Sequence, residues 1–387
     1  MTAAEQPTTS EVLRPLEHIR VVEFGQFIAG PGTSALLGEM GADVVKVEPP
    51  SGDSARTSGP FGTSMFAAYN RRKRSVVADL DSDDGVELAR RLCLTADVVV
   101  DNSRPGALGR RGLAHADLAP ARPDLVYGSV SGFPAGGPDA SRPAFDVVAQ
   151  AESGMMAIVG ERDGAPLKVA FTLVDSATTH ALTHGIVAAL LHRERTGAGS
   201  HVEVSLLDVA YSLQSQVWAQ YFASDAEPVR FGNGHPQVAP AGDLVAVADG
   251  HIVVSAYTEG HWRRLCAALH RDDLVDDPRF ATPDVRVANR PALLAELHHV
   301  LASDDRRSAV SRLTDAGVVA GAVLTYREAA TASNAGHSTM LQPYQDDSLL
   351  PRLGNPVTSS AWQPPGPGRP PSLGEHTEQI RNELGLA

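Results

Sequence analysis

The chain has 387 residues, of which 43% are hydrophobic, which is enough for large buried cores and typical of two globular domains. Its net charge of −13 excludes a general affinity for nucleic acid, which depends on clustered Lys and Arg side chains. No apolar run approaches the ~20 residues needed to cross a bilayer, and the polar start, residues 1–12, lacks signal-peptide features. We therefore expect a cytoplasmic protein with no membrane partner.

Strands and helices alternate through the first half of the chain. Strands rich in Val and Ile are predicted over 18–24, 42–48, 75–80, 96–101 and 124–130, and helices over 31–40 and 83–96. Such apolar strands are buried on both faces, and strand–helix–strand repeats indicate a parallel sheet. Residues 1–205 are therefore predicted to form a large, Rossmann-like, doubly wound α/β domain. Its first strand-to-helix turn reads GQFIAGPG rather than GxGxxG, which argues against an NAD-linked oxidoreductase, and we expect neither NAD nor flavin.

The sequence pattern changes after residue 205. A linker is predicted at 206–224, with a helix over 211–222. Two short strands joined around Asp249 and Gly250 predict a hairpin, and helices follow at 261–270 and 290–302. Residues 225–325 are therefore predicted to form a smaller α+β domain. The remaining segment, 326–387, includes an extended Pro-rich connector at 363–371.

One acid stands at a junction in the stretch VAFTLVDSATTHALTHG, residues 169–185. An apolar run over 169–174, interpreted as a strand, leads to Asp175, and residues 176–195 then read as a helix that Gly197 terminates. Asp is a favoured helix N-cap because its oxygen accepts a bond from a backbone N–H two or three residues on. An acid at such a junction can also be a nucleophile, but the pattern alone favours the cap.

Two further features bear on possible binding sites. Cys93 and Cys266 lie far apart with no CxxC or His-rich companion, so neither a disulfide framework nor a zinc site is indicated, and we expect no metal. The basic run over 71–74 is either a solvated face or a site for a small polyanion.

Eight blocks occur in one register along the chain: EFGQFIAGP, LLGEMGADVVKVEPPSGD, YNRRKRSVVADL, ADVVVDNSRPGALGRRGL, FDVVAQAESGMM, VDSATTHALTHGIVAALLHRERTGAGSHVEVSLLD, RFGNGHP and LGEHTEQIRNELG. Together they resemble the class III CoA-transferase family, which includes formyl-CoA transferase, carnitine CoA-transferase and α-methylacyl-CoA racemase. The resemblance implies an enzyme that takes coenzyme A as acyl-CoA, with an acyl-CoA donor and a carboxylic-acid acceptor. It also implies an interlocked homodimer of ring-shaped chains, in which 326–387 returns to the large domain.

The resemblance implies that Asp175 is the family's nucleophile, which forms an aspartyl–acyl anhydride and then an aspartyl-CoA thioester. Helix N–H groups at an N-cap would favour the ionised carboxylate, so capping and nucleophilic attack are compatible. The resemblance also identifies residues 232–237, with Gly232, Gly234 and His235, as a glycine-rich loop that covers the intermediate. An ordinary interdomain turn is the alternative for this loop.

Contacts with CoA are implied at further positions. Gln26, Phe27 and Ala29 would lie beside the pantetheine and thiol end, where N–H groups suit an oxyanion. The nucleotide and its phosphates would meet Arg72, Lys73, Asn102, Arg104 and Arg110. Two positions depart from the pattern, because Asp81 stands where some relatives have Lys near the adenine and Pro49 replaces an Arg.

The racemase branch is the nearest alternative activity. It uses a His followed by an Asp where this chain has Phe145 and Asp146, so no His is available to exchange the proton. Asp146 is interpreted as an acid that supports the active site or as the N-cap of the helix that follows it. A catalytically silent CoA-binding protein is a further alternative, which would not require Asp175. Gln26, Phe27 and Phe145 are expected to border an acyl pocket of partly apolar character.

Overall fold

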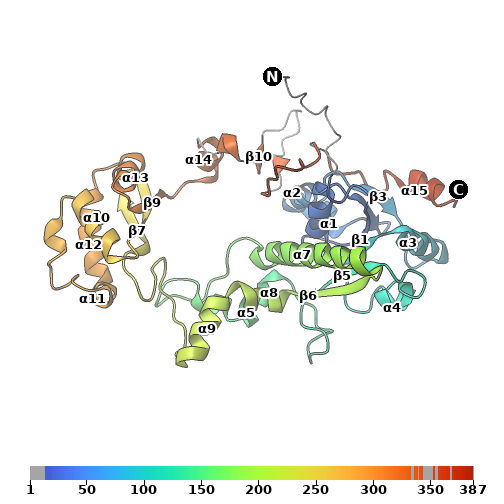
Figure 1. The fold of residues 1–387 in the computed structure, drawn as a ribbon, viewed down its shortest axis with the longest axis horizontal. Coiled ribbons are helices and arrows are strands. Elements are labelled where there is room, and N and C mark those ends of the chain that lie inside the picture. The colour runs from blue at the N-terminus through green and yellow to red at the C-terminus, as the bar shows by residue number, and fades with distance from the viewer. Residues whose placement is uncertain are drawn as a thin grey trace, which may run out of the picture. The chain divides into compact units, whose positions relative to one another are not determined.

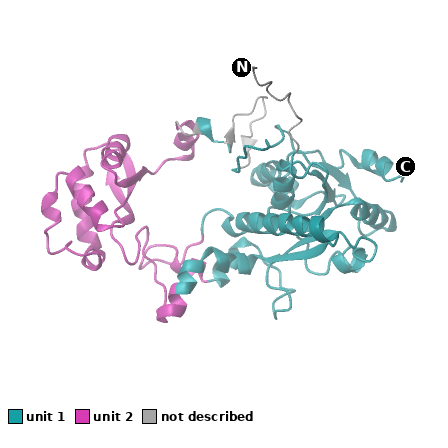
Figure 2. Cartoon of the chain, in the orientation of Figure 1, with its two compact units in different colours: residues 1–153, 169–219, 336–387 teal, residues 154–168, 220–335 magenta. Residues whose placement is uncertain are grey.

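A computed structural model describes residues 14–332, 335–338, 340–342, 352–353, 356–366 and 368–386. The chain divides into two compact units, which Figure 2 distinguishes by colour: residues 1–153, 169–219 and 336–387 form unit 1, and residues 154–168 and 220–335 form unit 2. This division assigns 154–168 to unit 2, whereas the sequence analysis included this segment in the domain 1–205. The polar start at 1–12 and residue 367 of the connector lie outside the described residues.

Unit 1 is built on a sheet of six parallel strands in the order β3-β2-β1-β4-β5-β6. The strands are β1 (Arg20–Phe24), β2 (Asp43–Glu48), β3 (Arg74–Val77), β4 (Val98–Asp101), β5 (Val126–Ser131) and β6 (Ser200–Ser205). The predicted parallel sheet is confirmed. Because the order reverses between β1 and β4, the loops leaving their carboxyl ends diverge, and a crevice is expected there.

Helices cover the sheet of unit 1 (Figure 1). They are α1 (Ala29–Glu39), α2 (Gly59–Tyr69), α3 (Asp83–Thr95), α4 (His115–Leu118), α5 (Asp146–Glu152), α7 (Leu173–Thr196), α8 (Leu206–Leu213) and α15 (Thr377–Glu383), with 3-10 turns at Ser54–Thr57 and Gly109–Arg111. Val22, Val99 and Leu88 belong to a core that also includes Ile380 of the C-terminal helix. On the opposite side, α7 lies close to β5 and β6, where Gly128 contacts Ile186.

The segment before α7 corrects the sequence analysis. Residues 169–172 form no strand, and α7 begins at Leu173 with Thr172 as its N-cap, so the predicted strand and the predicted cap role of Asp175 are both wrong. The backbone N–H of Val169 donates to the side chain of Gln150 rather than to a neighbouring strand. The end of α7 is as predicted, because Gly197 has a left-handed φ of 76° and its N–H donates to the Arg193 carbonyl.

Unit 2 contains a three-stranded antiparallel sheet in the order β7-β8-β9. The hairpin of β7 (Ala241–Val247) and β8 (Gly250–Ser255) is confirmed, and β9 (Val319–Ala322) joins it. Its helices are α6 (Met155–Ile158), α10 (Glu259–Ala268), α11 (Pro283–Ala288), α12 (Arg290–Leu301), α13 (Arg306–Asp315) and α14 (Tyr326–Thr331), with a 3-10 turn at Asp272–Leu274. Trp262, Phe280 and Leu297 are fully buried in its core.

Two connecting segments complete the chain. The helix predicted over 211–222 is two helices, α8 and α9 (Ser215–Ser224), which Gln214 separates. The Gln214 side chain is buried and donates to the carbonyl of Ser153, a contact that the local sequence pattern cannot reveal. Near the C-terminus a 3-10 turn (Ala335–His337) precedes the short strands β10 (Leu341–Gln342) and β11 (Arg352–Leu353), which pair with each other.

Candidate active site

A cavity of about 560 Å³ lies at the carboxyl ends of β1, β4 and β5, at the crevice that the strand order predicts. Loops after these strands and the first turn of α7 provide its walls. Its lining includes eight of the sequence-predicted site residues: Gln26, Phe27, Ala29, Asn102, Arg104, Arg110, Phe145 and Asp175. It also includes Arg142, which the sequence analysis did not identify and which lies just before Phe145 in the loop after β5.

Asp175 is the third residue of α7, and its backbone is fixed by another acid. The N–H groups of Val174 and Asp175 donate to Oδ2 of Asp146 at 2.6 and 3.1 Å. Asp146 is buried and is the first residue of α5, whose N-cap is Phe145. The predicted cap role of Asp146 for its own helix is therefore wrong, because its carboxylate binds the N-terminal N–H groups of α7.

The ionisation of Asp175 also differs from expectation. Burial, together with the negative charge of Asp146, raises the pKa of Asp175 from 3.8 to about 7. The expectation that helix N–H groups would favour the ionised form is wrong, since Asp146 occupies the N–H groups of Val174 and Asp175. A carboxyl group with this pKa is about half ionised at neutral pH and is a more basic nucleophile than an ordinary aspartate.

The turn after β1 is held by side chains from three other segments. Asn102 binds both sides of the Gln26 peptide, with its Oδ1 accepting from the Gln26 N–H and its Nδ2 donating to the Gln26 carbonyl, each at 2.9 Å. Lys46 donates to the carbonyl of Gly25 at 2.6 Å, and Asp53 accepts from the N–H of Phe27. These contacts hold Phe27 at a φ of 61°, which is unfavourable for a bulky residue.

Two aromatic rings line the cavity beside this turn. The rings of Phe27 and Phe145 meet edge to face, with centroids 6.2 Å apart. Phe145 is 67% exposed, so its ring is available to contact a ligand.

The predicted basic contacts separate into two groups. Arg104 and Arg110 line the cavity. Lys73, by contrast, is only 3% exposed. Its ammonium donates to Glu23 at 2.6 Å, and to the Pro31 carbonyl and the Asn70 side chain at 2.8 Å each. Burial lowers the pKa of Lys73 to about 8 despite the nearby charge of Glu23. The structure therefore places Lys73 in the interior of unit 1, away from the lining of the cavity.

Arg72 also lies away from this cavity. Its guanidinium donates to the carbonyl of Gly366 at 2.7 Å, and its side chain borders a separate hollow near the amino ends of β2 and β3. The carboxyl ends of the strands, where Asp175 lies, are at the opposite edge of the sheet.

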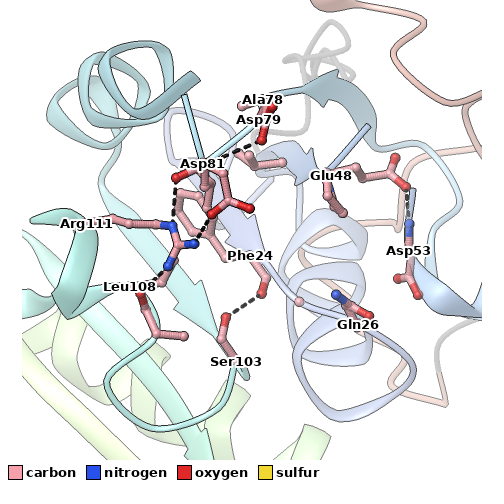
Figure 3. A pocket seen from close by; sticks show the side chains of 15 residues that line it. Phe24, Gln26, Glu48, Asp53, Ala78, Asp79, Asp81, Ser103, Leu108 and Arg111 are labelled. Carbon is pink, nitrogen blue, oxygen red and sulfur yellow. Dashed lines mark hydrogen bonds and ion pairs between the residues drawn. The ribbon is translucent and has the colours of Figure 1, made fainter. Parts of the chain in front are cut away.

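A second cavity, of about 250 Å³, adjoins the first and shares Phe24, Gln26, Ser103 and Ala107 with it. Figure 3 shows Arg111 reaching towards Asp81 across this cavity. Arg111 also donates to the carbonyl of Leu80 at 2.7 Å. The sequence analysis noted Asp81 but missed Arg111, although the doubled arginine at 110–111 was a visible signal. A ligand could extend from Asp175 past Gln26 into this second cavity.

The glycine-rich loop lies in unit 2. The N–H of Gly232 donates to the carbonyl of Gly160 at 3.1 Å, and Gly232 has a left-handed φ of 63°. Arg290, which the sequence analysis missed, donates to the carbonyls of His235 and Val238 and forms an ion pair with Asp243. Gly234 lies directly against Arg290, where an added Cβ would displace the guanidinium. One arginine thus binds both the loop and the start of the unit 2 sheet.

Two kinds of feature are absent from the described residues. They contain no group of three or more His, Cys, Asp or Glu side chains that could hold a metal ion. None of the helices described above combines the length and apolar character needed to span a membrane. Cys93 and Cys266 are free and buried, in the cores of unit 1 and unit 2 respectively.

Comparison with known proteins agrees with the resemblance seen in the sequence. The family described as CoA-transferase family III matches residues 16–377. Succinate–glutarate CoA-transferase of Agrobacterium fabrum is 36% identical and covers 96% of both chains. The probable fatty acyl-CoA transferase Rv3272 of Mycobacterium tuberculosis is 35% identical, with 95% of this chain and 98% of that one covered. A crystal structure of a CAIB/BAIF family protein from Brucella suis superposes with a TM-score of 0.87 at 36% identity, over 96% of this chain and 99% of that one.

Proposed function

The chain belongs to CoA-transferase family III and is an enzyme, and from that premise we propose that it moves CoA from an acyl-CoA thioester to a free carboxylic acid, with Asp175 as nucleophile. One observation supports this role most strongly. Asp175 is a carboxyl group with a raised pKa, and it lies in the cavity to which the sequence-predicted CoA contacts Gln26, Asn102 and Arg110 also converge.

The proposed reaction has two halves. The ionised Asp175 attacks the thioester carbonyl carbon and the C–S bond breaks, which gives a mixed aspartyl–acyl anhydride and CoA as the thiolate. The thiolate then attacks the aspartyl carbonyl of this anhydride, which releases the donor acid and leaves an aspartyl-CoA thioester. The acceptor carboxylate attacks that thioester to form a second anhydride, and the returning thiolate takes its acyl group. Asp175 is regenerated as the carboxylate, and no oxidant or metal is consumed.

Residues around Asp175 would bind and orient the substrate. The turn at 26–29, which Asn102, Lys46 and Asp53 hold, would lie beside the thiol end and present N–H groups to a developing oxyanion. Phe27 and Phe145 would provide apolar walls that limit water at the anhydride. The loop with Gly232, Gly234 and His235 is proposed to cover the intermediate.

The phosphates of CoA would occupy the basic part of the first cavity, and the rest of the nucleotide would extend into the second. Arg104 and Arg110 line the first cavity and suit phosphate oxygens with their planar guanidinium groups. Asp79, Asp81 and Arg111 border the second. We do not include Lys73 or Arg72 in this site, because Lys73 is enclosed by Glu23, Pro31 and Asn70, and Arg72 lies at another hollow.

Short dicarboxylic acids are the first class of substrate to test. Relatives are named succinate–glutarate, succinyl-CoA:mesaconate and acetyl-CoA:oxalate CoA-transferases. In this chain Arg142, which is not among the arginines assigned to the phosphates, lines the cavity with Asp175 and could pair with a second carboxylate. The fatty acyl-CoA transferase relative makes long apolar acyl groups the second class, which the exposed ring of Phe145 favours.

The test is a panel of acyl-CoA donors combined with free acids, with the products separated and weighed by mass spectrometry. We expect the CoA thioester of the added acid to form at the expense of the donor, fastest with succinyl- or glutaryl-CoA. In deuterated water the recovered donor should carry no deuterium at the carbon beside the carbonyl, because Phe145 offers no base. Deuterium incorporation without transfer would support the racemase alternative, and binding without either reaction would support a silent CoA-binding protein.

The proposed oligomeric state and cellular location of the chain also rest on its membership of this family. We propose that the large domain binds CoA and that two chains form an interlocked homodimer in the cytoplasm.

A further inference from the structure

We propose that Asp146 is a positioning residue for the reaction, which binds the N-terminal N–H groups of α7 and so leaves the Asp175 carboxylate free for nucleophilic attack. The inference rests on the proposed role of Asp175 as nucleophile. In this proposal Asp146 binds the backbone N–H groups at the helix end, and Asp175 reacts with the substrate.

The first N–H groups of a helix have no partner within that helix and require acceptors from elsewhere. The N-cap of α7, Thr172, provides no side-chain acceptor. Asp146 provides one from α5, and a single oxygen, Oδ2, accepts from both Val174 and Asp175. The end of α7 that carries Asp175 is therefore held by a residue 29 positions earlier in the chain.

Gln150 completes this arrangement from the next turn of α5. Its Nε2 donates to Oδ1 of Asp146 at 2.5 Å, and its Oε1 accepts from the N–H of Val169 at 2.8 Å. Gln150 is fully buried and Asp146 is 6% exposed. Both oxygens of Asp146 thus have donors, and the two side chains bind both ends of the segment 169–175. Their orientation is fixed, so the position of Asp175 is fixed as well.

The charge of Asp146 has a second consequence. It lies close enough to Asp175 to disfavour ionisation there, in addition to the effect of burial. The other charged side chains that line the cavity with Asp175 are Arg104, Arg110 and Arg142. Arg142 is itself paired with Glu152 and Asp139. The helices α1 and α8 and the strand β5 contribute only uncharged side chains to this lining.

Asp146→Asn separates charge from geometry, because the amide retains one oxygen for the α7 N–H groups. We expect the acid limb of the kcat/KM profile to move to lower pH by about one unit, since a neighbouring charge of this kind shifts a pKa by about 1–3 units. Glu194→Gln is the matched control. It removes an exposed acid from the far end of α7, the helix that carries Asp175, so the profile should not move.

A second readout does not depend on catalysis. The melting temperatures of the wild type and of Asp175→Asn are compared across pH 4–9, and the comparison is repeated with Asp146→Asn added to both proteins. The stability difference that Asp175→Asn produces should be smaller, and should reach its plateau at lower pH, when residue 146 is neutral. Asp146→Ala removes the acceptor as well as the charge, so its kcat should fall about tenfold or more below that of Asp146→Asn if Asp146 positions Asp175.

The two readouts distinguish the two proposals. If the wild type lacks transferase activity but the stability difference between it and Asp175→Asn depends on residue 146, the interaction between the two acids stands and the proposed nucleophile role of Asp175 is overturned. Equal kcat values in Asp146→Ala and Asp146→Asn would overturn the positioning role, and an unchanged stability difference and pH profile in Asp146→Asn would overturn the effect of the Asp146 charge on Asp175. Equal shifts of the pH profile in Asp146→Asn and Glu194→Gln would reduce the charge effect to general surface charge and would overturn it.

Discussion

Two acids at the start of α7 have different chemical surroundings. Asp146 accepts two backbone N–H groups and a side-chain amide, whereas Asp175 lies in the cavity with a pKa raised to about 7 by burial and by Asp146. A helix end can stabilise only as many acceptors as it has free N–H groups. The cap and the proposed nucleophile, which the sequence allowed to be one residue, are therefore two residues.

The raised pKa of Asp175 predicts how activity and stability depend on pH. The carboxylate is the attacking form, so kcat/KM should rise through pH ~7 and then level off. The folded state binds this proton more tightly than the unfolded state, so the stabilisation is complete below pH 3.8 and is lost as pH rises through about 7. Asp175→Asn should therefore be more stable than wild type at pH 8, by on the order of a few kcal/mol, and nearly equal to it at pH 4. Thermal melts at both pH values test this prediction. The same stability difference between the two proteins at pH 4 and pH 8 would contradict it.

Arg110 and Arg72 offer a direct comparison of the two basic groups. Arg110 lines the Asp175 cavity, whereas Arg72 contacts the carbonyl of Gly366 at another hollow. Arg110→Ala should raise the KM for acyl-CoA about tenfold or more, which corresponds to loss of one charge-assisted contact of ~1.5–3 kcal/mol. Arg72→Ala should leave this KM within about twofold. The reverse order of effects would move the phosphate site to Arg72.

At the scale of secondary-structure elements, the contact between α1 and α7 fixes the position of the turn at 26–29 relative to Asp175. A Cβ on Gly32 would lie 2.5 Å from Oγ1 of Thr179, so the helices approach closely only because residue 32 is glycine. Thr179 Oγ1 donates to the Asp175 carbonyl at 3.1 Å, one turn into α7. The turn at 26–29 and Asp175 are thereby joined through one tight contact.

Gly32→Ala should force α1 and α7 apart. We expect a loss of stability of ~1–3 kcal/mol, as for other overpacked contacts, and a clear fall in kcat. Gly260→Ala in α10 is the control, because its Cβ would meet nothing closer than 3.8 Å and alanine favours a helix. Chemical denaturation and steady-state kinetics measure both effects. Equal stability of the two variants would show that the α1–α7 contact is not tight.

The secondary-structure elements also show which features of the fold and the site could be predicted from the sequence. Runs of Val and Ile predicted the parallel sheet, because such runs are a local pattern. The site residues were predicted from the family resemblance, and the observed strand order then showed that they lie at the carboxyl edge of the sheet. The residues 169–172 were misread, since an apolar run does not reveal that Gln150 binds its backbone. Lys73 was misassigned for a similar reason, because its burial against Glu23 depends on a residue 50 positions away. Side chains that contact distant backbone leave no local signature.

At the scale of the whole molecule, each unit exposes large apolar side chains. Phe61 and Phe171 in unit 1 are 73% and 60% exposed, and Phe222 and Tyr326 in unit 2 are 77% and 95% exposed. Exposed apolar surface of this kind often marks protein–protein contacts. It supports the proposal of a homodimer whose interface covers part of each unit.

The proposed interlocked dimer makes a strong prediction about dilution. Chains that pass through one another cannot separate without unfolding, so sedimentation velocity should show one dimeric species at all concentrations down to the nanomolar range. Mixing differently tagged dimers should give no exchange over days under native conditions. A folded monomer that appears on dilution would contradict the interlocked arrangement, although it would leave the chemistry of Asp175 untouched.

The most direct test of the central claim is to trap the covalent intermediate on Asp175. The enzyme is mixed with acyl-CoA and quenched with hydroxylamine, which converts an anhydride or thioester of the aspartyl group to a hydroxamate. Peptide mass spectrometry should locate this modification at Asp175 in wild type, with none in Asp175→Asn or in enzyme without acyl-CoA. Transfer of CoA by Asp175→Asn at the wild-type rate, with deamidation excluded, or a hydroxamate on another residue, would contradict the account.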